Sequence, residues 1–125
     1  VEVGYRYFEG SAAGCVLLGQ RADCASFLTL FDWPDVVVEV AADGADLEEV
    51  IRELDACPAR VDAISRRNAA EALLHHDWVY RWHQILETVG LAPTERMLAR
   101  EEYLRGLAGA TGALDSVGAG YSSVS

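Results

Sequence analysis

Four residues with the types and spacing to bind a small anionic ligand lie close together near the start of the chain: Gly4, Tyr5, Arg6 and Glu9. Gly4 and Tyr5 stand where a helix is expected to begin, and the free N–H groups at a helix N-terminus attract anions. Arg6 adds a positive charge to the first turn, which either contacts a diphosphate or faces solvent. Glu9 places one carboxylate on the same short helix.

Arg6 and Glu9 also allow a purely local interpretation. They stand at positions i and i+3, where an ion pair on an exposed helix face contributes only about 0.2–0.5 kcal/mol. The spacing alone favours this surface pair, so the binding hypothesis depends on the elements around it.

A helix followed at once by an apolar strand would position these residues. The helix is predicted over residues 5–13 because apolar side chains recur there at helical spacing: Tyr5, Phe8 and Ala12. Gly14 is expected to end it in the left-handed conformation, and the small residues at 10–13 let the helix lie close to a strand over Cys15–Gly19. Glu9 then stands at the mouth of an α/β sheet.

A second strand is predicted over Val36–Val40, which is almost continuously apolar, as in parallel strands covered on both faces. The connection between the two strands includes a short helix near residues 25–31. It is longer than the dozen residues that a parallel crossover requires. The strands are therefore expected to be adjacent and parallel.

The second half of the chain reads as helical. Asp46 and Glu49 have capping-box spacing before an apolar stripe of Leu47, Val50, Ile51 and Leu54. Three further helices are expected, each marked by a residue suited to a helix start: Pro58 for 59–74, Asp77 for 78–89 and Thr94 for a helix through residue 107. Trp78 and Trp82 recur at i and i+4 and read as core side chains, although tryptophans, Trp33 included, also stack on bases and sugars.

Composition narrows the class of protein. The 125 residues are 51% hydrophobic and carry a formal net charge of −10, which suits a single globular domain and argues against nucleic acid or an anionic membrane as partner. No apolar run approaches the ~20 residues of a membrane span. The sequence contains three cysteines, and their spacing indicates no pairing: Cys15, Cys24 and Cys57. This suggests reduced thiols and a cytoplasmic protein.

The histidines do not form a metal motif. His75 and His76 are adjacent, so they point apart on a helix, and no His-x-x-x-His pair includes His83. A helix junction is the favoured interpretation, and neither a metal nor a cofactor is expected.

The segment Arg6-Tyr7-Phe8-Glu9, followed by Ala12, Ala13 and Gly14, resembles the donor-binding half of GT-B glycosyltransferases of group 1, and most closely the glycosyltransferase-like proteins of spore maturation. In that group a Glu on such a helix holds the ribose hydroxyls of a nucleotide-sugar, and Glu9 matches it. The partner Glu eight positions earlier is replaced by Val1. The resemblance continues from Leu47 to Leu91, through the Arg67-Asn68 pair and an aromatic-rich final helix.

The resemblance implies a partial Rossmann-like fold with a short parallel sheet, in which residues 1–91 form the C-terminal part of a GT-B donor-binding domain. Residues 92–107 would be a helical extension, and the Gly, Ala and Ser-rich residues 108–125 a disordered tail. The implied function is glycosyl transfer from a nucleotide-sugar, with Glu9, Arg6, Gly4 and Tyr5 binding the donor.

Two strands make a poor sheet, so completion by an N-terminal domain, by a second chain or by dimerisation is expected. The competing hypothesis is a non-catalytic α/β module, derived from such an enzyme, that binds a partner protein. Neither the donor base nor the acceptor can be read from these residues.

Overall fold

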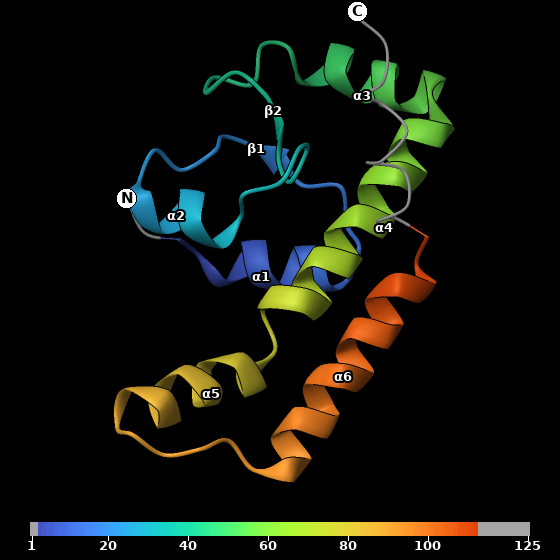
Figure 1. Ribbon diagram of the computed structural model, residues 1–125. Coiled ribbons are helices and arrows are strands. Elements are labelled where there is room, and N and C mark those ends of the chain that lie inside the picture. Colours follow the sequence, from blue (N-terminus) through green and yellow to red (C-terminus); the bar gives the residue numbers. More distant parts are fainter. Residues whose placement is uncertain (1–2, 113–125) are drawn as a thin grey trace, which may run out of the picture.

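The computed structural model describes residues 3–112 and contains a small sheet surrounded by helices (Figure 1). In chain order the elements are α1 (Tyr5–Ala12), β1 (Leu18–Gly19), α2 (Ala25–Leu30), β2 (Val38–Glu39), α3 (Leu47–Ala56), α4 (Pro58–His75), α5 (Trp78–Thr88) and α6 (Glu95–Ala110). The protein is thus α/β and helix-rich, with its sheet confined to the first third of the chain.

The two strands pair in parallel, as predicted, with Leu18 opposite Val38 and Gly19 opposite Glu39. Both are shorter than expected, because the ladder covers only two residues of each predicted five-residue run. Before β1, the carbonyl of Cys15 accepts a hydrogen bond from a side chain of α4 and is lost to the ladder. Before β2, Val36 is buried in an aromatic cluster instead of pairing with β1.

The main core is an aromatic cluster around α2 and the segment that follows it. Phe27 and Phe31 are fully buried and stack at 5.1 Å between ring centroids, and Trp33 lies 5.5 Å from Phe31. Tyr7 and Phe8 of α1 contact Phe31 at 5.8 and 4.9 Å. Offset and edge-on contacts of this kind stabilise aromatic pairs beyond their buried area. Because Trp33 is buried here, it is not free to stack on a ligand.

Helix α4 runs through the middle of the molecule, with α1 packed on one side and α6 on the other (Figure 1). Its Asn68 side chain is fully buried and joins two other segments. The amide nitrogen donates to the Cys15 carbonyl at 2.8 Å, and the amide oxygen accepts from the Trp33 indole at 2.8 Å. Asn68 therefore holds the start of the β1 segment and the aromatic cluster to α4.

Two glycines permit the close packing of α1, as the sequence predicts. Gly14 has φ +68°, and a Cβ there would lie 3.2 Å from the Ser65 carbonyl oxygen of α4. A Cβ on Gly10 would lie 2.4 Å from the Leu17 side chain. Small residues at both positions let α1 approach α4 and the segment leading into β1.

All four predicted helix starts are confirmed, and at three of them the predicted start residue also acts as expected. Asp77 accepts from the Val79 amide at 2.9 Å, Thr94 accepts from the Met97 amide at 3.3 Å, and Pro58 opens α4. At α3, Asp46 is the N-cap residue as predicted, but the predicted capping box does not form, because the Asp46 carboxylate accepts from the Ala41 amide and bonds no helical amide.

The predicted apolar stripe of α3 is only partly buried. Leu54 packs with Val38 and Ile64, and Val50 packs at the edge of this small cluster. Leu47 and Ile51 are 39% and 42% exposed, because α3 packs on this cluster through Val50 and Leu54.

Helix α6 extends through Ala110, three residues beyond its expected end. Leu104 and Ala108 are buried, and Ala108 packs against Ala70 of α4. The predicted extension therefore shares a core with the preceding residues, and the prediction of a disordered tail is wrong for residues 108–110, which are helical. Positions 113–125 of that tail lie outside the described residues.

Replacing Asn68 by Ala should lower the free energy of unfolding by about 2 to 4 kcal/mol, because two buried groups, the Trp33 indole N–H and the Cys15 carbonyl, lose their partner together. Urea denaturation of both proteins measures this difference.

A double-mutant cycle with Trp33→Phe isolates the indole–amide bond. The two substitutions should cost less together than the sum of the single costs, by about 1 kcal/mol. Strict additivity would mean that this hydrogen bond contributes nothing to stability.

Candidate functional site

Helix α1 presents the four predicted site residues on its solvent side. Gly4 is the N-cap residue, with φ −70° and ψ 153°, and Tyr5, Arg6 and Glu9 are exposed, Tyr5 to 85%. At 3.6 residues per turn, positions 5, 6 and 9 fall within about a third of the helix circumference. The structure therefore brings the predicted residues together on one surface.

The opposite side of α1 holds the helix in place. Phe8 packs against Phe31, Tyr7 donates its hydroxyl to the Gln20 carbonyl at 2.9 Å, and the buried Ser11 hydroxyl donates to the Tyr7 carbonyl within the helix. The predicted apolar face is consequently wrong at Tyr5 and Ala12, which are exposed. The buried face is centred on positions 7, 8 and 11, and this rotation is what turns Glu9 outward.

Arg6 and Glu9 do not form the local ion pair that their spacing allows. The ion pairs among residues 3–112 include neither side chain. No side chain caps the N-terminus of α1, and Gly4 contributes only its carbonyl, which accepts from the Tyr7 amide at 3.2 Å. One carboxylate, one guanidinium and the first amides of a helix thus share an exposed surface.

The three histidines have three different environments, at and beyond the end of α4. His75 lies 3.2 Å from Glu71, and His83 lies 2.6 Å from the buried Glu101 of α6. His76 is the C-cap residue of α4, which confirms the predicted helix junction. Within residues 3–112, no group of three or more His, Cys, Asp or Glu side chains is arranged to hold a metal ion.

The ring of His76 is enclosed by aromatic side chains. Its centroid lies 4.9 Å from Phe8, 4.8 Å from Phe31 and 5.9 Å from Trp33. Burial, helped by the nearby positive charge of Arg81 and by His75, lowers the pKa of His76 from 6.5 to about 4. The imidazole is therefore neutral at pH 7 and belongs to the aromatic core that supports α1.

Helix α5 overturns the prediction that Trp78 and Trp82 are core residues, because they are 73% and 55% exposed. The helix attaches to α6 through polar groups: Asp77 pairs with Arg100 at 2.8 Å and His83 contacts Glu101. That hydrogen bond to Glu101 raises the pKa of His83. Helix α5 thus docks through these polar groups and the buried Val79. Its exposed apolar stripe consists of Trp78, Trp82, Ile85 and Val89.

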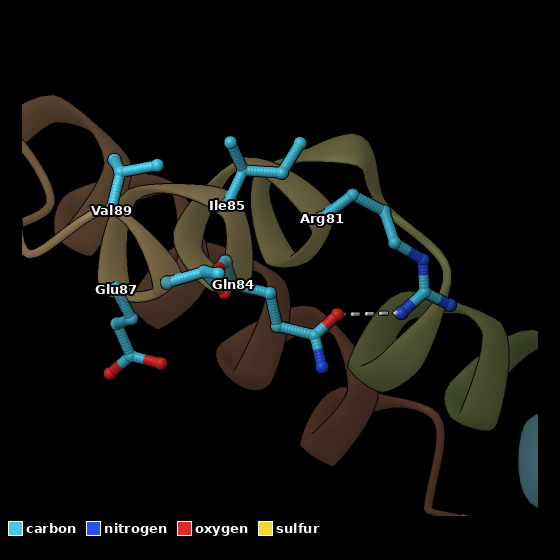
Figure 2. Close-up of a pocket in the computed structure, with 6 residues that line it drawn as sticks. Arg81, Gln84, Ile85, Glu87 and Val89 are labelled. Atoms are coloured by element: carbon cyan, nitrogen blue, oxygen red, sulfur yellow. Dashed lines mark hydrogen bonds between the residues drawn. The ribbon is translucent and has the colours of Figure 1, made fainter.

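Figure 2 shows the outer part of this helix, where Ile85 and Val89 point to one side, Glu87 to the other, and Arg81 donates to Gln84 at 3.5 Å. The surface hollow here, of about 480 Å³, is lined only by residues of α5 and its C-cap residue Val89. A single convex helix offers a ligand no opposing wall, so this face is suited to contact with another macromolecular surface.

Two further sequence expectations concern location and thiols. Among the helices of residues 3–112, none has the length and apolar character needed to cross a membrane. Cys15, Cys24 and Cys57 are free thiols, and Cys15 is exposed beside β1 instead of lying inside a strand.

A sequence profile of the family described as "Glycosyl transferase-like" matches residues 1–87, which covers α1 through all but the last residue of α5. Neither the curated proteins nor the solved structures that were compared with the chain gave a match. Because the profile match covers more than half of the chain, the chain belongs to this glycosyl transferase-like family. The matched segment contains the exposed face of α1 and most of the core that supports it.

Sequence reasoning missed the roles of Asn68 and His76, which together fix the inner side of α1 and the segment after it. A signal was present for Asn68, because it stands beside alanines in a helix interior, and an amide that is buried there needs a hydrogen-bond partner. No pattern in the sequence indicated that His76 would meet three aromatic rings from distant segments.

Stability should fall as the solution is acidified from pH 6.5 towards about 4. In this window the unfolded chain binds a proton at His76 that the folded protein excludes, so the free energy of unfolding should drop by about 1 to 2 kcal/mol for this partly solvent-screened ring. Urea denaturation at a series of pH values measures the slope.

The His76→Phe variant keeps an aromatic ring and removes the titrating group, so its slope between these pH values should be smaller. The carboxylates contribute equally to the pH dependence of unfolding in both proteins, so their contribution cancels when the two slopes are compared. Equal slopes would show that His76 is as easily protonated in the folded protein as in the unfolded chain.

Proposed function

We propose that this chain is the donor-binding part of a glycosyltransferase that uses a nucleotide-sugar. The observation that carries the proposal is the coincidence of the family match with an exposed, unpaired carboxylate at Glu9. The motif Arg6-Tyr7-Phe8-Glu9 resembles the pattern of GT-B group 1 glycosyltransferases, and most closely that of the spore-maturation branch. In that pattern a Glu on such a helix holds the ribose.

Each predicted residue has a separate role in this proposal. Glu9 accepts hydrogen bonds from the ribose hydroxyls, because an ionised carboxylate is an acceptor only. Arg6 and the first amides of α1 after Gly4 lie beside the diphosphate, where a guanidinium and a helix N-terminus favour negative charge. Tyr5 is exposed next to them and forms one wall for the nucleoside.

The contribution to catalysis is positioning and electrostatic stabilisation of the leaving diphosphate. Holding the ribose and diphosphate fixes the anomeric carbon relative to an acceptor, and the positive groups stabilise the charge that develops as the sugar leaves. The proposal assigns no catalytic residue and no metal to this chain.

A second Rossmann-like domain, contributed by the same polypeptide or by another, completes the site in this proposal. Two features support it. The sheet has only two residues per strand, which is too little to fold stably by itself. The apolar stripe of α5 is exposed, and a contiguous apolar surface of this kind marks an interface. Residues 1–91 then form the C-terminal part of a GT-B donor domain, with 92–107 as a helical extension.

A non-catalytic interaction module remains the alternative, and the exposed α5 stripe is the observation in its favour. The two hypotheses separate on the ligand. A module would bind a protein through α5 and show no affinity for nucleoside diphosphates, whereas a donor domain requires both surfaces.

Replacing Glu9 by Gln should weaken binding of a nucleoside diphosphate by about 1 to 3 kcal/mol, the usual cost of losing a charged hydrogen bond. Calorimetry would use the full polypeptide that carries this chain, or this chain with a Rossmann-like domain encoded beside it. The uridine, guanosine, adenosine and thymidine diphosphates form the panel.

Glu49→Gln is the matched control, because Glu49 is also an exposed helical glutamate but lies on α3. Its affinity should equal that of the unmodified protein. If no diphosphate binds, or if Glu9→Gln binds as well as the control, the interaction module is the better account.

Trp82→Ser should weaken association with the completing domain at least tenfold, because an exposed tryptophan in an interface is a frequent energetic anchor. Tyr103→Ser, which removes an exposed aromatic side chain of α6, is the control. Titration of labelled chain with the domain gives both affinities, and equal losses in the two variants would contradict the role of α5.

A further inference from the structure

A hollow of about 260 Å³ lies between α4, the segment before β2 and the residue Gly112 after α6, and we call it the arginine hollow. Three of the ten Lys and Arg residues of the chain line it, together with one carboxylate, that of Asp35: Arg60, Arg66 and Arg67. Three positive charges and one negative charge give this lining a net charge of +2, in a chain whose formal net charge is −10.

Helix α4 places two of these arginines on either side of an apolar floor. Positions 60, 63, 64 and 67 share one face of a helix, because their spacing is i, i+3, i+4 and i+7. Ala63 and Ile64 therefore lie between Arg60 and Arg67, whose Cα atoms are separated by about 10 Å along the helix axis. Two long side chains at this separation are able to contact one small ligand from both ends of the floor.

The ion pairs of the arginines leave donors for a ligand. Arg60 reaches across the hollow to Asp35, with its Nη2 atom 3.2 Å from Oδ1, and this contact joins α4 to the segment before β2. A guanidinium has five N–H donors, so each arginine keeps others free of its pair. Arg66 and Arg67 pair with carboxylates one turn away along α4 that lie outside the lining, Asp62 and Glu71.

The backbone of Asp35 has an uncommon conformation that sets one edge of the hollow. Its φ is +56°, in the left-handed region that residues other than glycine adopt infrequently. Trp33 and Val36 are buried on either side of it, so the packing of the aromatic cluster holds this turn in place. The turn keeps the Asp35 carboxylate opposite Arg60.

The charge and the shape of the hollow favour a small dianion with an organic substituent. Guanidinium groups bind phosphate and carboxylate with two parallel hydrogen bonds, but only a dianionic phosphate balances a net charge of +2. The floor of Ala63 and Ile64 offers apolar contact to a substituent. Nucleic acid or an anionic membrane would extend beyond the hollow over an acidic chain, which would repel it.

We infer that the arginine hollow binds a small phosphate monoester, with the phosphate group between Arg60 and Arg67 and the organic group against Ala63 and Ile64. Pro34 and Asp35 precede β2, so the hollow lies at the amino ends of the parallel strands. The Tyr7 hydroxyl instead joins α1 to the Gln20 carbonyl, just after β1 ends. The site is therefore separate from the Glu9 surface and does not depend on the proposed nucleotide-sugar function.

Phenyl phosphate is the probe, titrated into the full chain by calorimetry in about 0.1 M salt at about pH 7.5, where a phosphate monoester is mostly dianionic. Inorganic phosphate lacks the organic group, and benzoate carries one charge less. Phenyl phosphate should bind saturably, at least threefold more tightly than inorganic phosphate and at least tenfold more tightly than benzoate.

Two variants should change this affinity in opposite directions. Arg60→Gln should weaken phenyl phosphate binding at least fivefold, because it removes a charged hydrogen bond. Asp35→Asn should tighten binding about threefold, because it removes the negative charge of the lining, and Asn tolerates the left-handed conformation. Both side chains are more than 40% exposed, so neither substitution opens the core.

Arg96→Gln and Glu95→Gln are the matched controls, because they make the same charge changes at the start of α6. They lie more than about 20 Å along the helix from Gly112, which exceeds the screening length of about 10 Å in this salt. Both controls should bind phenyl phosphate like the unmodified chain.

Absence of saturable binding, or equal effects of the variants and their controls, would show that these arginines form ion pairs only. A loss of affinity in Arg6→Gln but not in Arg60→Gln would place the phosphate at α1 instead. Equal affinities for phenyl phosphate and benzoate would contradict the dianion. Equal affinities for phenyl phosphate and inorganic phosphate would contradict the monoester and identify free phosphate as the ligand.

Discussion

The buried amide of Asn68 is the interaction on which the arrangement of the chain depends. It donates to the Cys15 carbonyl and accepts from the Trp33 indole, so one side chain of α4 fixes two segments that are far apart in sequence. Either partner left alone would be a buried polar group without a hydrogen bond, which is costly. The position of β1 relative to α4, and with it the exit of α1, follows from this pair of bonds.

Helices α1 and α5 expose opposite kinds of side chain. Helix α1 packs Phe8 and Ser11 towards the core and leaves its charged residues Arg6 and Glu9 in solvent. Helix α5 is attached through Asp77 and His83, and its exposed side is apolar. An exposed polar surface on one helix and an exposed apolar stripe on another are consistent with the proposed domain that works against a second domain.

The sequence by itself determined the order and type of the elements. The left-handed end at Gly14 and the starts of α3, α4, α5 and α6 were predictable, because they depend on residues near in sequence. The parallel pairing was predictable from two apolar runs and the length of the connection between them. The grouping of Gly4, Arg6 and Glu9 was predictable for the same reason, since helical geometry alone places them together. Their ligand is not fixed by this local geometry.

Only the tertiary structure decided which side of each helix is buried. The aromatic cluster selects Phe8 and leaves Tyr5 outside, and the polar contacts of His83 turn Trp78 outward, although the two tryptophans have core-like spacing. The short ladder has the same origin, because Asn68 takes a carbonyl that the sheet would otherwise use. Each outcome depends on contacts between residues that are distant in sequence, and the periodicity of one segment carries no information about the other segments that pack against it.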